Sequence, residues 1–188
     1  MAGSKQSLQQ VRSRYEILRA TARDVAHEAI APVLRNKRHE IISKQQIAFK
    51  SFDIKTGMEL RKYERSPRRR VQWNWADATA KYFAEPRRFE LAIWHKEMTL
   101  CGVSLGKLSG KGGKLRLDFI EAHPDGSALD GLITKLIIDA TLVYAKVIGA
   151  EQIRITNPIN DHVRNHYLSF DGFQFDKHNN FCYRDVNL

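Results

Sequence analysis

The first quarter of the chain carries small and apolar residues at alternating intervals of three and four. They lie between positions rich in Arg and Gln, and they are Leu8, Val11, Tyr15, Leu18, Ala22, Val25, Ala29 and Val33. This spacing predicts a helix from Lys5 to Ser43, within an N-terminal helical extension over residues 1–45, that Pro32 kinks or divides. The apolar seam either packs on the protein's own core or joins a second copy in a homodimer. The small alanines favour the core.

Residues 47–52 alternate between apolar and polar side chains, which is typical of a half-buried strand. The segment Lys55-Thr56-Gly57 is typical of a turn, so Met58 to Tyr63 is expected to return as the second strand of a hairpin. A short helix is predicted from Ala76 to Ala84, just before Pro86.

From Phe89 onward the pattern is that of strands followed by alternating helices and strands. Strands are predicted over residues 89–94, 99–108 and 115–122, and the short turns between them make these strands antiparallel. A long helix with a wide apolar face is predicted over residues 128–148, and Gly149 is expected to end it. A buried strand is predicted at 152–156, a helix at 161–170, and a final pair of strands at 172–175 and 180–185.

Length and composition place the chain among soluble globular proteins. It has 188 residues, of which 43% are hydrophobic and 28% are charged, so one domain with an extension is expected. No apolar run is long enough to cross a bilayer, and the N-terminus lacks the apolar core of a secretory signal. We therefore expect a cytoplasmic protein. Cys101 and Cys182 lie in apolar, strand-like segments without zinc-type spacing, so we expect reduced, buried thiols and no bound metal.

The formal net charge of +10 indicates a polyanionic partner, either nucleic acid or a phosphate-rich cofactor such as coenzyme A. The densest basic segment is a loop with Arg68, Arg69 and Arg70, followed by Trp73 and Trp75. Arginines beside exposed aromatic rings could bind a phosphate chain and stack a base, or line the binding site of an acceptor substrate. The simpler interpretation, a solvated loop followed by two core tryptophans, is favoured.

The order strand, strand, strand, long helix, strand, helix, strand, strand resembles the conserved part of the GCN5-related N-acetyltransferase (GNAT) superfamily. Three segments are similar to family motifs. They are residues 120–125, which end the third strand in Ala-His-Pro, residues 149–155, where Gly precedes a strand, and residues 160–173, where Asn160, Val163 and Tyr167 are in register. The resemblance implies an α+β fold, an α/β three-layer arrangement with a mixed, mostly antiparallel sheet flanked by helices, over an acyltransferase domain at 46–188.

The resemblance also implies acetyl-CoA as a co-substrate and a set of residues that bind it. The backbone of Phe119, Ile120 and Ala122 would bond the pantetheine arm as a short extra strand does. The N–H groups around Gly126, Ser127 and Gly131 would face the pyrophosphate. Amide side chains of Asn157 and Asn160 would contact the cofactor.

For catalysis, the resemblance implies that the hydroxyl of Tyr167 protonates the departing thiolate. A general base would come from Glu121 or His123, with Asp118 as a third candidate on the same strand. His162 and His166 flank Tyr167, but one helix does not point all three residues at one site, so both histidines are assigned to the surface or the core.

The phosphate loop departs from the family pattern. The family has a basic residue and paired glycines, whereas residues 125–131 here read Asp-Gly-Ser-Ala-Leu-Asp-Gly. Two functions therefore stay open. One is an N-acetyltransferase that moves an acetyl group to an unknown amine by direct attack in a ternary complex. The other is a catalytically degenerate GNAT-like protein that binds nucleic acid or a protein partner.

Overall fold

The computed structural model describes residues 7–110 and 112–186. Its centre is a seven-stranded sheet with the strand order β3-β4-β5-β6-β7-β9-β8. These strands are β3 (Ile47–Lys50), β4 (Arg88–His95), β5 (Thr99–Leu108), β6 (Lys114–Ala122), β7 (Gln152–Thr156), β8 (Gln174–Asp176) and β9 (Phe181–Asp185). Neighbouring strands are antiparallel except β6 and β7, which run parallel. The predicted mixed, mostly antiparallel sheet is confirmed.

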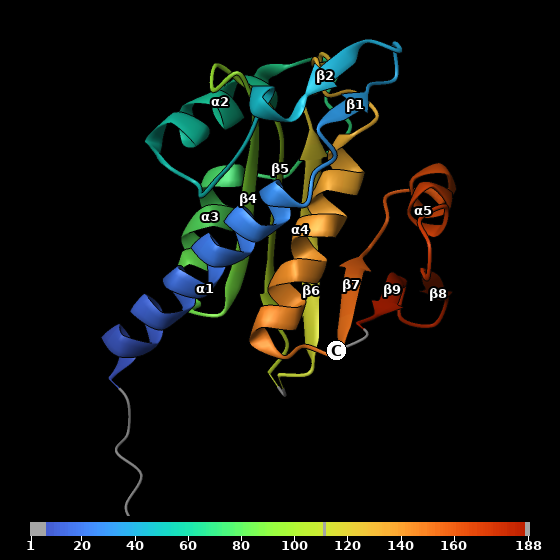
Figure 1. The fold of residues 1–188 in the computed structure, drawn as a ribbon. Helices are drawn as coiled ribbons and strands as arrows, with labels where there is room; N and C mark the ends of the chain where they lie inside the picture. Colours follow the sequence, from blue (N-terminus) through green and yellow to red (C-terminus); the bar gives the residue numbers. More distant parts are fainter. Residues whose placement is uncertain (1–6, 111, 187–188) are drawn as a thin grey trace, which may run out of the picture.

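Helices cover both faces of this sheet (Figure 1). One face packs against α1 (Leu8–Glu28) and α4 (Ile133–Ile148), and the opposite face packs against α2 (Ile54–Arg65) and α3 (Trp75–Phe83). The shorter α5 (Asp161–Leu168) contacts β9. A single 3-10 turn, η1 (Lys44–Gln46), precedes β3. This arrangement is the expected three-layer α+β fold.

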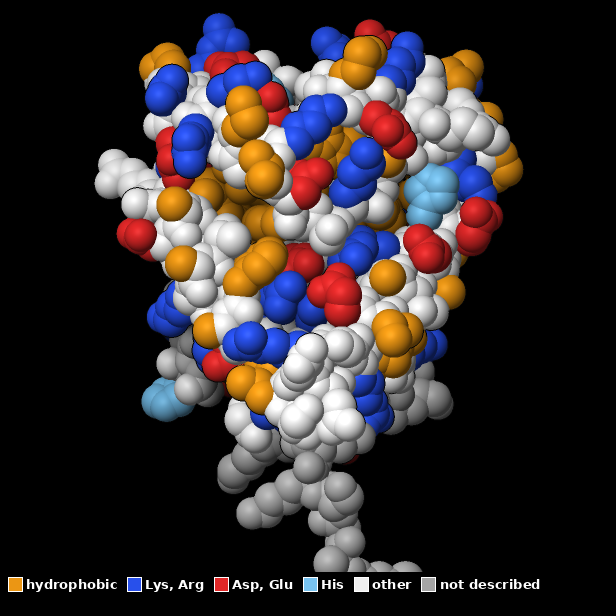
Figure 2. Space-filling view, turned by 90° about the vertical axis from the view of Figure 1, so that its left-hand side faces the viewer, with side chains coloured by type: hydrophobic (Ala, Val, Ile, Leu, Met, Phe, Trp, Pro, Cys, Tyr) orange, Lys and Arg blue, Asp and Glu red, His pale blue; other side chains and the backbone are white. Residues whose placement is uncertain are grey.

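The surface that carries α2 and α3 has a mixed charge pattern. Figure 2 views the molecule from the left-hand side of Figure 1 and shows lysine and arginine side chains dispersed among acidic and apolar ones. The net charge of +10 is therefore not gathered into one continuous basic stripe on this face. Within residues 7–110 and 112–186, no helix combines the length and the hydropathy that crossing a bilayer needs.

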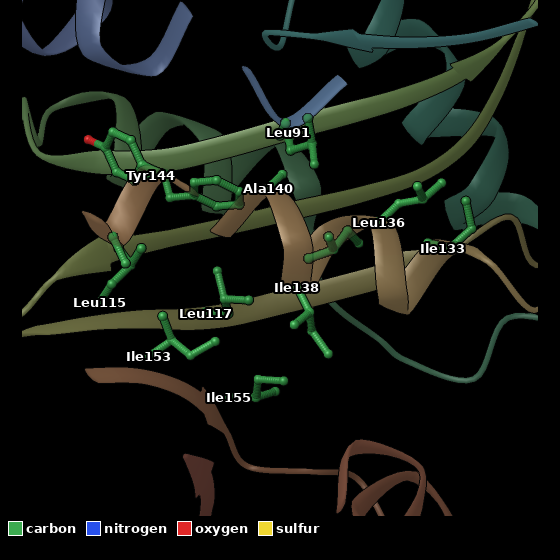
Figure 3. Close-up of a cluster of buried hydrophobic side chains, with 14 of the residues drawn as sticks. Leu91, Leu115, Leu117, Ile133, Leu136, Ile138, Ala140, Tyr144, Ile153 and Ile155 are labelled. Carbon is green, nitrogen blue, oxygen red and sulfur yellow. The ribbon is translucent and has the colours of Figure 1, made fainter. Parts of the chain in front are cut away.

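The larger hydrophobic core lies between the sheet and α4. Figure 3 shows Leu136 and Ile138 of α4 facing Leu91, Leu117 and Ile155 of the strands. Each of these side chains is at most 3% exposed. Full burial of such a side chain stabilises the fold by about 1.5–3 kcal/mol, so this layer fixes α4 and the strands beneath it. Cys101 and Cys182 are buried and free, as expected.

The N-terminal segment folds differently from the single long helix that its pattern predicts. Helix α1 begins after Ser7, whose hydroxyl accepts a hydrogen bond from the Gln10 N–H, and it ends at Glu28. Pro32 has no N–H and disfavours a helical residue before it, so the chain turns into a hairpin of β1 (Val33–Arg35) and β2 (Ile41–Ser43). Ala22 and Ala26 are buried against α4, which is the own-core packing that the sequence favours.

The predicted return strand at 58–63 is wrong, because residues 54–65 form α2. Asp53 caps this helix through its carboxylate, which accepts the N–H of Thr56 at 2.7 Å. Leu60 and Tyr63 are buried at helical spacing. The turn signal of Lys55-Thr56-Gly57 is in fact the first turn of the helix. The other predicted elements are present, except that α4 begins at Ile133 because residues 128–132 form turns and Gly131 has a φ of 84°.

A β-bulge in β6 shapes the centre of the sheet. Leu105 pairs with Phe119 whereas the next residue, Gly106, pairs with Leu117, so Asp118 is the extra residue. Gly106 lets the two backbones approach closely, since a Cβ at this position would lie 2.0 Å from the Arg116 carbonyl oxygen. Bulges bend a strand and increase its local twist. The bend occurs where β6 loses its pairing with β7.

We expect Gly106→Ala to destabilise the protein by about 3 kcal/mol, because the added methyl group meets rigid backbone rather than a side chain that can move. Urea unfolding followed by circular dichroism measures this loss. The matched control is Gly57→Ala in α2, where an added Cβ meets nothing within 4 Å. That variant is expected to gain about 0.5–1 kcal/mol. Equal stability of the two variants would contradict the tight contact at the bulge.

Candidate active site

The parallel strands β6 and β7 pair over half of β6 and then separate. Their register runs from Lys114 with Gln152 to Leu117 with Ile155, while β6 continues to Ala122. The other edge of β6 stays paired with β5, where the His123 N–H donates to the Cys101 carbonyl at 2.9 Å. Because backbone groups alternate sides along a strand, those of Ile120 and Ala122 face the opening. A strand edge of this kind can bond an extended ligand.

A cavity of about 600 Å³ fills this opening. Its walls come from the end of β6, the start of α4, the end of β7 and α5, and the α2–α3 loop closes one side. It therefore connects the face of the sheet that carries α4 with the face that carries α2 and α3. This volume is in the range of small-molecule sites in proteins.

The N-terminus of α4 lies at this cavity without a side-chain cap. Leu132 occupies the cap position and makes no such bond, and Gly131, Ile133 and Thr134 line the cavity. By contrast, Ser7, Asp53, Asn74 and Asn160 cap the other α-helices in the described chain through their side chains. The first-turn N–H groups of α4 have no partner within the helix, and the helix dipole makes this end favourable for an anion.

The loop before α4 is held in shape by its own carboxylate. Asp130 Oδ1 accepts the Ser127 N–H at 2.8 Å, and the Ser127 hydroxyl accepts the Leu129 N–H at 3.2 Å. Gly126 has a φ of 84° in this loop. Ser127 is buried and is not among the residues that line the cavity. The Ser127 N–H that the resemblance directs at a phosphate is thus already bonded to Asp130.

The β1–β2 hairpin packs on this loop and brings a cation to the cavity. The Lys37 N–H donates to the Asp130 carbonyl at 2.8 Å, and the Asn36 side chain donates to the Ala128 carbonyl at 3.0 Å. Arg38 reaches the Ser127 carbonyl at 3.2 Å. Lys37 lines the cavity next to Gly131. A lysine that is distant in sequence thus stands beside the open end of α4.

Glu121 lines the cavity from β6, and three donors hold its carboxylate. Arg69 binds both oxygens, with Nε–Oε1 and Nη2–Oε2 distances of 2.8 and 3.0 Å, and Trp75 Nε1 donates to Oε2 at 2.6 Å. The Glu121 and Arg69 side chains are 6% and 8% exposed. Bidentate, charge-assisted pairs of this kind are strong and geometrically specific. They fix the α2–α3 loop to the central strand.

We expect Glu121→Gln to lower the free energy of unfolding by about 3 kcal/mol, because it leaves the buried Arg69 guanidinium without its counter-charge. Denaturant unfolding measures this change. Asp139→Asn, in the exposed pair with Lys135, is the matched control and should cost under about 1 kcal/mol. The double variant Glu121→Leu with Arg69→Met should recover much of the loss. A single variant as stable as the native chain would contradict the pair's role.

The other two predicted bases also have protein partners. His123 Nδ1 accepts the Asp125 N–H at 3.2 Å, so the proton of a neutral ring resides on Nε2, and the ring packs edge-on against Tyr63 at 4.8 Å. Asp118 accepts hydrogen bonds from Arg116, Tyr82 and Thr156. Both side chains therefore already accept hydrogen bonds from the protein.

Helix α5 forms the wall opposite β6. Asn160 caps it by accepting the Val163 N–H at 2.9 Å, so this amide serves the helix and is not among the cavity-lining residues. Tyr167 is buried and lines the cavity. Burial raises the pKa of its hydroxyl, and Cys182 adds to the shift. His162 and His166 lie at the surface, as assigned, but both also line the cavity with Tyr167, so the expectation that one helix cannot bring all three residues to one site is wrong. Partial desolvation lowers the pKa of His166, and nearby His162 lowers it further.

The structure brings most of the predicted site residues together. Those that line the cavity are Ile120, Glu121, Ala122, His123, Gly126, Gly131, Asn157, Tyr167, Arg68, Arg70 and Trp73. Phe119 does not line the cavity: its carbonyl accepts the Ser104 hydroxyl of β5, and its ring packs against Trp73 and Trp75 on the sheet face of α2 and α3. Trp75 is a core residue, as the simpler interpretation has it, whereas Trp73 is half-buried at the cavity. Lys37 was missed, because nothing in its local sequence marks it.

Comparison with known proteins finds structures with a similar fold. No family model matches the sequence, and no curated protein is detectably related to it. Solved structures do match, among them spermidine N-acetyltransferase from Vibrio cholerae, crystallised with CoA and spermine. It has a TM-score of 0.59 and 10% identity, and the match covers 76% of this chain and 96% of that one.

Two further structures agree. PaiA N-acetyltransferase from Thermoplasma acidophilum in complex with coenzyme A has a TM-score of 0.54 and 14% identity, over 74% of this chain and 98% of that one. An acetyltransferase of the GNAT family from Staphylococcus aureus has a TM-score of 0.57 and 12% identity, over 75% and 99%. This chain therefore has the fold of the GCN5-related N-acetyltransferases.

Proposed function

We propose that the protein is an N-acetyltransferase that moves an acetyl group from acetyl-CoA to an amine. One observation carries the proposal: the unpaired half of β6 and the uncapped start of α4 face the same cavity. The first suits an extended amide-containing arm and the second suits a phosphate. Two of the structurally similar acetyltransferases contain CoA, which supports this assignment.

In this proposal the pantetheine arm pairs with the backbone of Ile120 and Ala122, while the pyrophosphate lies against the N–H groups at the start of α4. Lys37 supplies the positive charge that the loop itself lacks. Asp130 also lines the cavity, and its Oδ1 atom accepts the Ser127 N–H. The family's basic loop residue is thus replaced by a lysine from the β1–β2 hairpin.

Acetyl-CoA supplies a thioester that a neutral amine attacks directly, so the new C–N bond forms as the C–S bond breaks. Tyr167 gives its hydroxyl proton to the departing sulfur, and the proton that the amine loses restores the tyrosine through solvent. A raised pKa keeps this hydroxyl protonated at neutral pH, as an acid must be. Holding both reactants in one cavity supplies much of the rate.

Glu121 acts as a positioning residue in this mechanism. Its carboxylate already accepts three hydrogen bonds from Arg69 and Trp75, which hold the α2–α3 loop on β6. His123 and Asp118 are engaged in the same way. The amine therefore reaches the thioester already neutral, without a protein base on β6.

The second candidate is a binding protein for nucleic acid on the same scaffold. The Asp130 carboxylate at the Ser127 N–H, where a phosphate would otherwise bond, is the observation that favours it. The dispersed charge over α2 and α3 opposes it (Figure 2). Binding to duplex DNA and structured RNA across a salt series tests this candidate. Affinity that falls steeply with salt would support it, and affinity indifferent to salt would exclude a phosphate-driven mode.

Thermal unfolding tests the proposed function. Saturating acetyl-CoA, or its unreactive analogue desulfo-CoA, should raise the melting temperature, because a ligand at about 100 times its Kd stabilises the native state by about 2.7 kcal/mol. Other acyl-CoA thioesters in the same experiment report which acyl group fits. A melting temperature unchanged by all of them would contradict the proposal.

A further inference from the structure

The α2–α3 loop forms the end of the cavity that lies opposite the start of α4. Arg68, Arg70 and Trp73 line it there, on the sheet face opposite α4. The phosphate-binding groups assigned above, Lys37 and the start of α4, belong to the other face. The reacting centre lies where the two ends meet, beside β6 and Tyr167. A second substrate would therefore enter against the arginines.

The three consecutive arginines of this loop have different surroundings. Arg69 points inward and pairs with Glu121. Arg68 and Arg70 are exposed, and neither guanidinium makes a hydrogen bond or ion pair with the rest of the described chain. Two guanidinium groups with free donors therefore border the same cavity. Guanidinium is the protein group best suited to bind carboxylate or phosphate in a bidentate fashion.

The acidic groups near the cavity do not offset these charges. Glu121 is neutralised by Arg69, and Asp130 bonds to its own loop. Asp125, just outside the cavity lining, accepts the Ser66 hydroxyl at 2.9 Å. A polycationic acceptor would thus meet two unpaired arginines at this end, because Asp130, the other acidic residue of the lining besides Glu121, belongs to the α4 loop at the opposite end. This end of the cavity is built for an anion.

We propose that the acceptor is an amine that also carries a carboxylate or phosphate group, and that Arg68 and Arg70 bind this group. The inference rests on the proposed acetyltransferase function and specifies its second substrate. It separates this chain from the structurally similar enzyme of Vibrio cholerae, whose structure contains spermine. Trp73 adds a flat apolar surface beside the arginines, against which the body of the acceptor packs.

The same charges assist the reaction. An ammonium group near two guanidinium groups loses its proton more readily, since like charges disfavour the charged form. Pairing with Arg68 and Arg70 also cancels the negative charge of the acceptor's own acid group, which would otherwise favour the protonated amine.

A series of amines that share a two-methylene linker and differ in the group at its other end tests the proposal. The amines are β-alanine with a carboxylate, O-phosphoethanolamine with a phosphate, ethanolamine with a hydroxyl and 1,2-diaminoethane with an ammonium group. Each is incubated with the full-length protein and acetyl-CoA, and thiol release and the acetylated product are measured. We expect kcat/KM for at least one acidic amine to be at least about ten times that for the diamine. A tenfold difference corresponds to the contribution of one charged hydrogen bond. The two acidic amines distinguish carboxylate from phosphate.

Variants locate the effect. Arg68→Gln and Arg70→Gln should each remove most of the preference for the acidic amine, mainly through KM, and Arg70→Glu should shift it toward the diamine. Arg65→Gln is the matched control, because Arg65 is an exposed arginine of α2 that does not line the cavity. Three results would overturn the inference. The diamine could react as fast as the acidic amines, or no acidic amine could react above the amine-free rate. The preference could also survive in both glutamine variants. Failure of the acetyltransferase proposal is seen separately, as absence of any desulfo-CoA binding.

Discussion

Replacing Tyr167 with phenylalanine should lower kcat about 100-fold, the usual contribution of a positioned general acid. The ring stays in place against the cavity wall, so the affinity for desulfo-CoA and the fold should change little. Without the hydroxyl, the departing thiolate takes its proton from water. Steady-state thiol release with saturating acetyl-CoA measures the loss.

The proposed role of Tyr167 also predicts how the reaction rate depends on pH. Burial raises the pKa of Tyr167 above its ordinary value of 10, so the hydroxyl keeps its proton as the pH rises from 7 to 10. Between pH 7 and 10, the rates of the native enzyme and of the Tyr167→Phe variant should therefore change with pH in the same way. The folded state holds this proton more tightly than the unfolded state, so the associated stability is present below pH 10 and is lost above it.

Tyr144→Phe is the control for a buried tyrosine. Its hydroxyl donates to the Arg88 carbonyl at 3.0 Å in the core under α4, and it does not line the cavity. That variant should lose about 1 kcal/mol of stability and keep its kcat. A native kcat in the Tyr167→Phe variant would contradict the role of Tyr167 as the acid. An equal loss of kcat in the Tyr144→Phe variant would also contradict it.

Reversing the charge of Lys37 should weaken acetyl-CoA binding at least about tenfold, because a charged contact to phosphate is replaced by repulsion. The weakening should diminish at high salt, where charge interactions are screened. Isothermal titration of Lys37→Glu with desulfo-CoA measures it. The hairpin fold should survive, since Lys37 contacts the α4 loop through its backbone N–H.

Arg35→Glu separates a local contact from a general change of charge. Arg35 is an exposed residue of the same hairpin, outside the cavity, and its substitution changes the net charge equally. Its affinity for desulfo-CoA should stay within about twofold of the native value, because its exposed side chain does not line the cavity and salt screens its charge. If both variants lose the same affinity, Lys37 has no direct role at the phosphate.

The sequence predicts the second half of the fold well, because its apolar pattern there is strong and its elements are long. Strands β5 and β7 have the predicted bounds, and β6 differs by one residue. The N-terminal region is harder to predict, because local signals conflict. The helical spacing of apolar residues continues past Pro32, although the chain there forms a hairpin. Thr56-Gly57 resembles a turn, although Asp53 caps a helix at this point. Burial in the folded protein decides between such local patterns, and the spacing of residues along the sequence does not reveal it.

The site is predictable where its residues belong to β6 and α5, which carry the family-like segments. Ile120, Ala122 and Tyr167 follow from that resemblance. Lys37 and the engagement of Glu121 by Arg69 do not, because they arise from contacts between segments more than 50 residues apart. Their positions are set by docking of the hairpin on the α4 loop and of the α2–α3 loop on β6. Such packing decides which charges are free and which are neutralised.

Hydrogen exchange with and without saturating acetyl-CoA tests most directly whether the opening between β6 and β7 is the cofactor site. The backbone N–H groups of Ile120 and Ala122 face the opening and those of residues 131–135 begin α4, so binding should slow the exchange of both segments. Exchange in α2, on the far face of the sheet, should not change. Slowed exchange in both segments is the predicted result. Unchanged exchange at both, or protection confined to other parts of the chain, would contradict the account.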